Sequence, residues 1–165
     1  MRKEKCKISN SLRDEAIKYI KNAEDILSKS SIEDNRYIDV KYVKSACGIA
    51  YLGVLKAIDE YLLKRGVTEK ELPKKVEEYI KALKKYAGVH NGKLIKQFYD
   101  IYHELHIAGY YRGDLRSVGA VKSAINTAKD FIEKISEKVK KVDFGMEKNQ
   151  GFPEPTYEVG GKREG

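Results

Sequence analysis

The sequence is poor in cysteine and has no long apolar run, and each absence excludes a class of protein. Only two of its 165 residues are cysteine, which is too few for a disulfide framework or a four-ligand zinc site. No segment approaches the roughly 18 consecutive apolar residues of a membrane-spanning helix. The charged N-terminus is followed by no apolar segment typical of a secretory signal. We therefore expect a soluble, cytoplasmic protein that makes no contact with a membrane.

Proline is also rare, and its position divides the chain. Two of the three prolines, Pro153 and Pro155, follow residue 142, as do five of the 13 glycines. This stretch lacks the hydrophobic periodicity of a packed helix or strand. We expect a single helical-bundle domain over residues 1–142 and a mobile or extended tail over residues 143–165.

Charged residues, in contrast, are abundant. Lys and Arg number 33 against 25 Asp and Glu, which gives a net charge of +8, and 41% of the residues are hydrophobic. The apolar fraction is sufficient for one core, and the length fits one domain of roughly 100–200 residues. The positive excess predicts an acidic partner, either a protein or RNA.

Apolar residues recur every three or four positions through most of the domain, a spacing typical of amphipathic helices. No alternation typical of strands is present. A capping box begins at Thr68, and Gly66 and Gly88 mark helix ends. The expected helices cover about residues 11–28, 36–64, 68–88, 92–109 and 117–142. Short connections between them predict an all-α fold, an antiparallel up-and-down bundle of four to five helices.

The second helix is expected to lie at the centre of the bundle. Cys47 falls on its apolar face and is predicted to be a small core residue. Small residues recur along the same helix at helical spacing and predict that another helix approaches it closely. These residues are Ala46, Ala50, Gly53 and Ala57.

One short segment is the only cluster of chemically capable side chains in the sequence. Asp100, His103, Glu104 and His106 lie within two helical turns. The histidines are three residues apart, whereas zinc proteases place them four apart on a helix. A metal site completed by another helix is one interpretation, and a solvated or interfacial helix face is the other. We expect no metal and no cofactor.

The segment that follows is predicted to be a loop, residues 110–116. Gly113 permits an unusual backbone turn, and Arg112 and Arg116 are candidates for binding an anion. A structural turn with a local salt bridge is the alternative. Tyr110 and Tyr111 are predicted either to form part of the wall of a site or to close the end of the core.

Positive charge is most concentrated between Lys81 and Tyr99, where no acidic residue occurs. Two helix ends joined by a short loop would present this charge together, which predicts non-specific contact with phosphates. A solvated lysine-rich turn is the alternative. The candidate anion-binding residues in this basic hairpin are Lys84, Lys85, His90, Lys93 and Lys96.

Three helical segments resemble HEPN-like proteins, a superfamily of helical bundles. They are YIDVKYVKSACGIAY at 37–51, LHIAGYY at 105–111 and SAINTAKDFI at 123–132, and the likeness covers about residues 11–142. The resemblance implies a homodimer, since members are often dimeric. It also raises ribonuclease activity, because many members are metal-independent ribonucleases with an Arg, a polar residue and a His. Here Lys96, Gln97 and His103 stand nearest to that motif, and lysine lacks the planar fork of arginine.

The function predicted from these observations is a HEPN-like, non-catalytic binding or interaction module that forms a homodimer. One alternative is a divergent ribonuclease that uses Lys96 and His103. Another is non-specific binding of nucleic acid or anions through the basic hairpin.

Overall fold

The computed structural model describes residues 2–88, 92–143 and 145. Within these residues the chain is almost entirely helical, and the prediction of an all-α bundle is confirmed. The elements are α1 (Arg2–Leu27), β1 (Ile32–Glu33), β2 (Arg36–Tyr37), α2 (Val40–Lys64), the 3₁₀ turn η1 (Glu69–Glu71), α3 (Val76–Tyr86), α4 (Gly92–Ile101), the π-helix η2 (Tyr102–Arg112) and α5 (Val118–Asp143).

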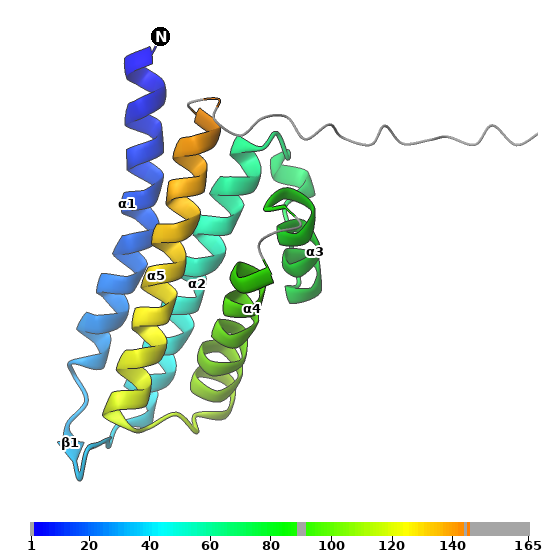
Figure 1. Ribbon diagram of the computed structural model, residues 1–165. Helices are drawn as coiled ribbons and strands as arrows, with labels where there is room; N and C mark the ends of the chain where they lie inside the picture. The colour runs from blue at the N-terminus through cyan, green and yellow to red at the C-terminus, as the bar shows by residue number, and fades with distance from the viewer. Residues whose placement is uncertain (1, 89–91, 144, 146–165) are drawn as a thin grey trace, which may run out of the picture.

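Helix α2 lies at the centre, as the sequence predicts. The long helices α1, α2 and α5 run side by side, and α3 and α4 lie beyond α2 from α1 (Figure 1). Because α2 packs against α1, α5, η2 and α3, most of its circumference is buried, including Val43, Val54 and Ile58, and one face that includes Leu52 stays exposed. The core therefore surrounds one helix, and its neighbours are positioned by how closely they approach it.

Gly53 sets the closest approach of α1 to α2. A Cβ atom built on Gly53 would lie 2.8 Å from the Cβ atom of Tyr19 and 3.1 Å from the carbonyl oxygen of Ala16. Both distances are shorter than ordinary van der Waals contacts. The predicted small-residue stripe is thus confirmed, and α1 is the helix that uses it at this position.

A short β-hairpin connects α1 to α2, where the sequence analysis expected no strand. Asp34 and Asn35 adopt positive φ angles of 46° and 60°, the conformation of a type I′ turn. Each strand has only two residues, too few for an alternating pattern. The hairpin also binds the start of α5, because the Tyr37 N–H donates to the Arg116 carbonyl at 3.0 Å and the Val118 N–H to the Asn35 carbonyl at 3.0 Å.

Two further boundaries differ from the expected ones. Helix α1 begins at Arg2, well before residue 11. The capping box at Thr68 is present but starts only η1, and α3 begins at Val76. Pro73 separates the two, since proline disfavours a helical conformation in the residue before it, and Leu72 is accordingly extended with ψ 141°.

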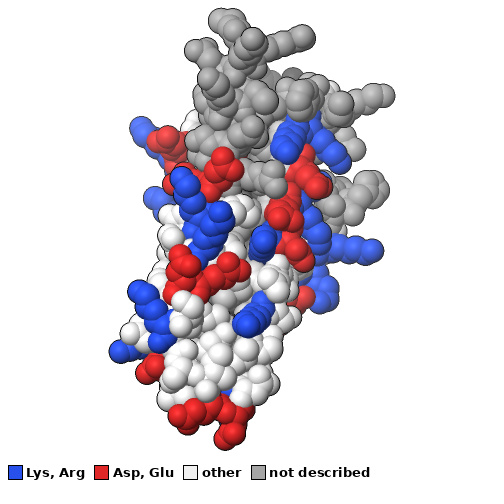
Figure 2. All heavy atoms as spheres, turned by 90° about the vertical axis from the view of Figure 1, so that its left-hand side faces the viewer, with Lys and Arg blue, Asp and Glu red and all other residues white. Residues whose placement is uncertain are grey.

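Helix α5 ends at Asp143, close to the predicted domain boundary at residue 142. The tail residues 146–165 lie outside the described residues. Across residues 2–88 and 92–143, no helix combines the length and the apolar composition needed to cross a membrane. Positive and negative side chains are interspersed on the side where α1 lies (Figure 2), so the excess charge is not concentrated there.

The close approach at Gly53 predicts a measurable cost of adding one methyl group. Gly53→Ala should lower the free energy of unfolding by about 1–3 kcal/mol, because the crowded Cβ forces α1 away from α2. Urea denaturation measures this change. Gly119→Ala is the control, since Gly119 is exposed in the first turn of α5 and an added Cβ would lie 4.0 Å from Oγ of Ser117, an ordinary contact distance. That variant should gain up to about 1 kcal/mol from helix propensity. Equal stability of the two variants would contradict the packing argument.

Candidate functional site

A cleft of about 730 Å³ opens between α2, the start of α3 and η2. Its floor on α2 runs from Ser45 to Leu55, eleven residues that span about 15 Å of helix. The α2 residues in the cleft are mostly apolar, and Leu52 is half exposed. The lining residues of α2 are Ser45, Gly48, Ile49, Tyr51, Leu52 and Leu55.

The opposite wall of the cleft is a ladder of aromatic rings on η2. The ring centroids of Tyr102 and His106 are 5.5 Å apart with an angle of 25° between the planes, and those of His106 and Tyr110 are 5.7 Å apart at 23°. A π-helix closes hydrogen bonds between residues five apart and so has more residues per turn than an α-helix. Residues four apart therefore lie nearly above one another, which aligns the three rings.

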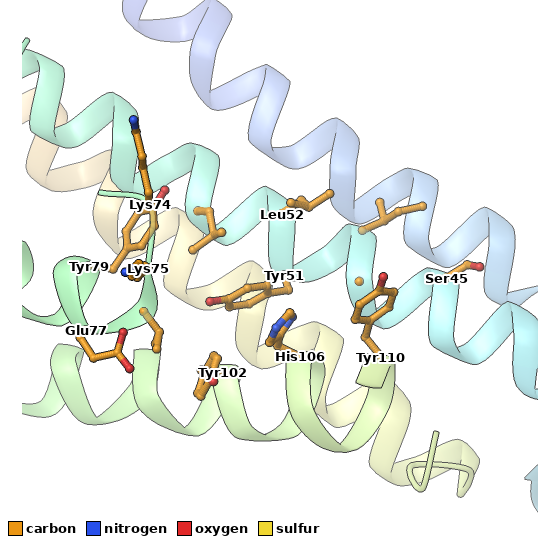
Figure 3. Close-up of a pocket in the computed structure, with 14 residues that line it drawn as sticks. Ser45, Tyr51, Leu52, Lys74, Lys75, Glu77, Tyr79, Tyr102, His106 and Tyr110 are labelled. Carbon is orange, nitrogen blue, oxygen red and sulfur yellow. The ribbon is translucent and has the colours of Figure 1, made fainter. Parts of the chain in front are cut away.

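Tyr51 of α2 completes the aromatic wall. Its ring centroid lies 4.9 Å from that of His106 and 6.1 Å from that of Tyr102. Figure 3 shows His106 at the middle of the cleft, with Tyr51 and Tyr102 on one side and Tyr110 on the other. Two helices thus supply one continuous aromatic surface, and Tyr51 has only 6% of its surface exposed.

A close contact between Gly109 and Cys47 holds η2 against α2. A Cβ on Gly109 would lie 2.5 Å from Sγ and 2.7 Å from Cβ of Cys47, so no larger residue fits. Cys47 is fully buried, which confirms its predicted place in the core, and burial raises the pKa of its thiol to about 12. The neutral thiol therefore acts as a small packing group at the base of the cleft.

Two hydrogen bonds position α3 at the other end of the cleft. The Tyr79 hydroxyl donates to Oδ1 of Asp59 at 2.9 Å, and the Tyr61 hydroxyl donates to the Tyr86 carbonyl at 2.8 Å. Both join α2 to α3. As a result Lys74 and Lys75, which directly precede α3, line the cleft.

The aromatic surface is uncharged near neutral pH. Burial lowers the pKa of His106 below its ordinary value, which favours the neutral imidazole. Burial, and secondarily the neighbouring Tyr102, raise the pKa of Tyr51. The charged side chains that line the cleft are Lys74, Lys75 and Glu77, all at the α3 end (Figure 3).

The two histidines of the segment 100–106 have different surroundings. His106 lies in the cleft, as the interfacial interpretation expects. His103 is exposed and outside the cleft, where its ring centroid is 4.4 Å from that of Tyr99 and 5.1 Å from that of Tyr102. Among the described residues, no group of three or more His, Cys, Asp or Glu side chains is arranged to hold a metal ion.

The predicted basic hairpin lies away from the cleft. Lys84 and Lys85 are exposed at the end of α3, and Lys93 is exposed at the start of α4. The Lys96 ammonium forms an ion pair with Asp100 at 2.7 Å. His90 lies outside the described residues.

The predicted loop begins later than expected, because η2 extends through Arg112. Gly113 then ends the helix in the left-handed conformation, as expected, with φ 72°. Arg112 and Arg116 are both exposed, and neither lines the cleft. Of the two adjacent tyrosines, Tyr110 forms part of the cleft wall, whereas Tyr111 is 73% exposed.

The sequence analysis did not select Tyr51, Lys74 or Lys75 as site residues. A signal for the aromatic wall was present in the four-residue spacing of Tyr102, His106 and Tyr110. That spacing places the three rings on one face of the helix, and the π-helical winding brings them closer to one line. For Lys74 and Lys75 no sequence signal existed, since their position depends on how α3 docks on α2.

Comparisons with known proteins assign a family. Residues 11–137 match a domain of unknown function, DUF5618, and the chain belongs to this family. No curated protein matches the sequence. A solved structure of a protein of unknown function from Dyadobacter fermentans is similar, with 30% sequence identity and a TM-score of 0.67. The match covers 79% of this chain and 98% of that one. All residues that line the cleft fall within the family region.

Because Asp59 is half buried, we predict that the free energy of unfolding depends on pH through its carboxyl group. Burial raises the pKa of Asp59, and the Tyr79 hydrogen bond and the charge of Lys56 only partly oppose this shift. The folded protein therefore binds a proton at the Asp59 carboxyl more tightly than the unfolded chain does. The stability that the protonated carboxyl contributes is lost as pH rises through the folded-state pKa. Asp59→Asn keeps an acceptor oxygen for Tyr79 but does not ionise.

Thermal unfolding at two pH values tests this. Relative to wild type, the midpoint of Asp59→Asn should be higher at about pH 7 than at about pH 4, because a raised pKa leaves more of the wild-type carboxyl protonated at the lower pH. The same difference at both pH values would contradict a raised pKa at Asp59.

Proposed function

We propose that this protein is a HEPN-like binding module and that the cleft between α2, α3 and η2 is its ligand site. The proposed ligand contains a flat, apolar ring system. The observation that carries the proposal is the continuous aromatic surface of Tyr51, Tyr102, His106 and Tyr110 along an open cleft of about 730 Å³. Small-molecule sites commonly have volumes of about 300–1,000 Å³ with predominantly apolar linings.

The geometry favours a ring as the bound group. Aromatic pairs are most stable when rings are offset or tilted with centroids about 4.5–7 Å apart, and the lining rings already contact one another in that range. A flat ligand would extend this series. Leu52 is 51% exposed on the facing helix, so a ligand would also remove apolar surface from water there.

The two alternative functions receive less support from the side-chain positions. The Lys96 ammonium is engaged by Asp100, and neither Lys96 nor His103 lines the cleft. Lys84, Lys85 and Lys93 are exposed in the manner of a solvated lysine-rich surface. Binding in the aromatic cleft is therefore the function that we propose in preference to ribonuclease activity or anion binding at the basic hairpin.

The homodimer implied by the HEPN-like resemblance stays a prediction. Light scattering at micromolar concentration should give about twice the monomer mass of 18.8 kDa. A mass near 18.8 kDa would refute the dimer without affecting the proposed ligand site.

Binding of phenylnaphthylamine, a neutral aromatic dye that fluoresces in apolar surroundings, tests the proposed site. We expect saturable binding by the wild-type protein. His106→Ala removes the central ring of the ladder and should weaken binding about tenfold, roughly the loss of one good aromatic contact. Leu52→Lys should also weaken binding, because it places an ammonium in the apolar wall at a position that is already half exposed and tolerates polarity.

The matched control is His103→Ala, which removes an exposed ring from the same helix η2 outside the cleft. This variant should bind the dye as the wild type does. Circular dichroism and thermal unfolding of each variant establish that the fold is retained. If the dye does not bind, or if His106→Ala and His103→Ala bind it equally, the cleft is not the ligand site.

A further inference from the structure

The two ends of the cleft differ in charge, and this difference bears on the kind of ligand that it accepts. The argument rests on the proposed function and concerns the chemistry of the ligand. At the α3 end, Lys74 and Lys75 line the cleft, and Glu77 is the one carboxylate among its lining residues. At the opposite end, Ser45 and Tyr110 are uncharged (Figure 3).

Lys75 lies on the side to which Tyr51 points, whereas the Lys74 side chain extends away from Tyr51 (Figure 3). Neither ammonium group forms an ion pair or a hydrogen bond with a described residue. The neighbouring Glu78 does not line the cleft, and its carboxylate accepts a hydrogen bond from the backbone N–H of Lys74 at 2.7 Å. The backbone hydrogen bond from Lys74 and, secondarily, the charges of Lys75 and Lys74 lower the pKa of Glu78, so Glu77 and Glu78 partly offset the two lysines at this end.

The Tyr51 hydroxyl is a second, independent feature of this end. Tyr51 is more than nine-tenths buried, yet its hydroxyl forms no hydrogen bond with a described residue. Among the described residues, every side-chain nitrogen or oxygen that is fully shielded from solvent has a hydrogen-bond partner. Because the Tyr51 hydroxyl has none, it is not fully shielded, and it opens into the cleft that Tyr51 lines. In Figure 3 it points toward the α3 end, where Lys75 lies. The Tyr79 hydroxyl is not available in this way, because Asp59 accepts its hydrogen bond.

We propose that the cleft binds a planar aromatic acid in one orientation. The ring system lies against His106 and Tyr51, and the anionic group lies at the α3 end. There it accepts a hydrogen bond from the Tyr51 hydroxyl and lies on the side of Lys75, with Lys74 next to it in the chain. Hydrogen bonds donated by a partly desolvated phenol or by an ammonium group are stronger when the acceptor carries a negative charge.

Two dyes with the same ring skeleton test the proposal. Anilinonaphthalene sulfonate is phenylnaphthylamine with an added anionic group. We expect the wild-type protein to bind the sulfonate about tenfold more tightly than the neutral dye at low salt, and the advantage should shrink as salt screens the lysines. Fluorescence titration measures both affinities.

Three variants assign the preference to named groups. Lys74→Gln combined with Lys75→Gln should abolish most of the sulfonate advantage, and Tyr51→Phe should lower sulfonate affinity about fivefold, the value of one hydrogen bond. In both variants the affinity for the neutral dye should fall less than that for the sulfonate, because the neutral dye carries no anionic group. Lys129→Gln combined with Lys141→Gln removes two exposed charges from α5 and should change neither affinity.

The outcomes separate this inference from the proposed function. If neither dye binds, the proposed site and the inference both fail. If the neutral dye binds but the sulfonate binds no more tightly, or if its advantage survives in the Lys74/Lys75 and Tyr51 variants, the aromatic acid is excluded while the aromatic site stands. If the α5 control and the Lys74/Lys75 variant lose the same amount of sulfonate affinity, the preference depends on the overall charge of the protein, and the inference is wrong.

Discussion

Close packing against α2 is the constraint on which the rest of the structure depends. Helix α2 contacts α1, α5, η2 and α3, and it can do so because small residues face several neighbours. At Gly53 the absence of a side chain lets α1 approach, and at Cys47 a small thiol meets Gly109 of η2. Close approach buries the apolar side chains around α2, which is the main source of stability in a helical bundle.

The candidate site follows from the same packing. Close contacts between Cys47 and Gly109 and between Gly48 and Tyr110 hold η2 against α2. Tyr102, His106 and Tyr110 are four residues apart, so their rings lie on one face of η2, and the π-helical winding brings them closer to one line. The aromatic wall of the cleft therefore follows from the close packing of η2 on α2 and from the spacing of these rings.

The position of the charged end depends on a different pair of contacts. Tyr79 and Tyr61 use their hydroxyl groups to join α3 to α2, one through a side chain and one through a backbone carbonyl. These hydrogen bonds leave the Tyr51 hydroxyl as the unengaged phenol beside Lys75. A binding preference for an acid would thus depend on which tyrosine hydroxyl already donates a hydrogen bond within the protein. The residue type alone does not show which one that is.

Much of the architecture could be predicted from the sequence because it depends on local patterns. Apolar spacing located the helices, the small residues of α2 indicated its central place, and Cys47 was recognised as a core residue. The β-hairpin at Asp34 and Asn35 was missed because each strand has only two residues, and the start of α3 was misplaced because Pro73 interrupts the pattern after the Thr68 cap. Which histidine lines the cleft, and why Lys74 and Lys75 lie beside Tyr51, was decided only by the tertiary structure. Helical periodicity places a side chain on a face of its own helix, whereas a site requires that faces of separate helices meet, and those meetings are set by packing between residues far apart in the chain.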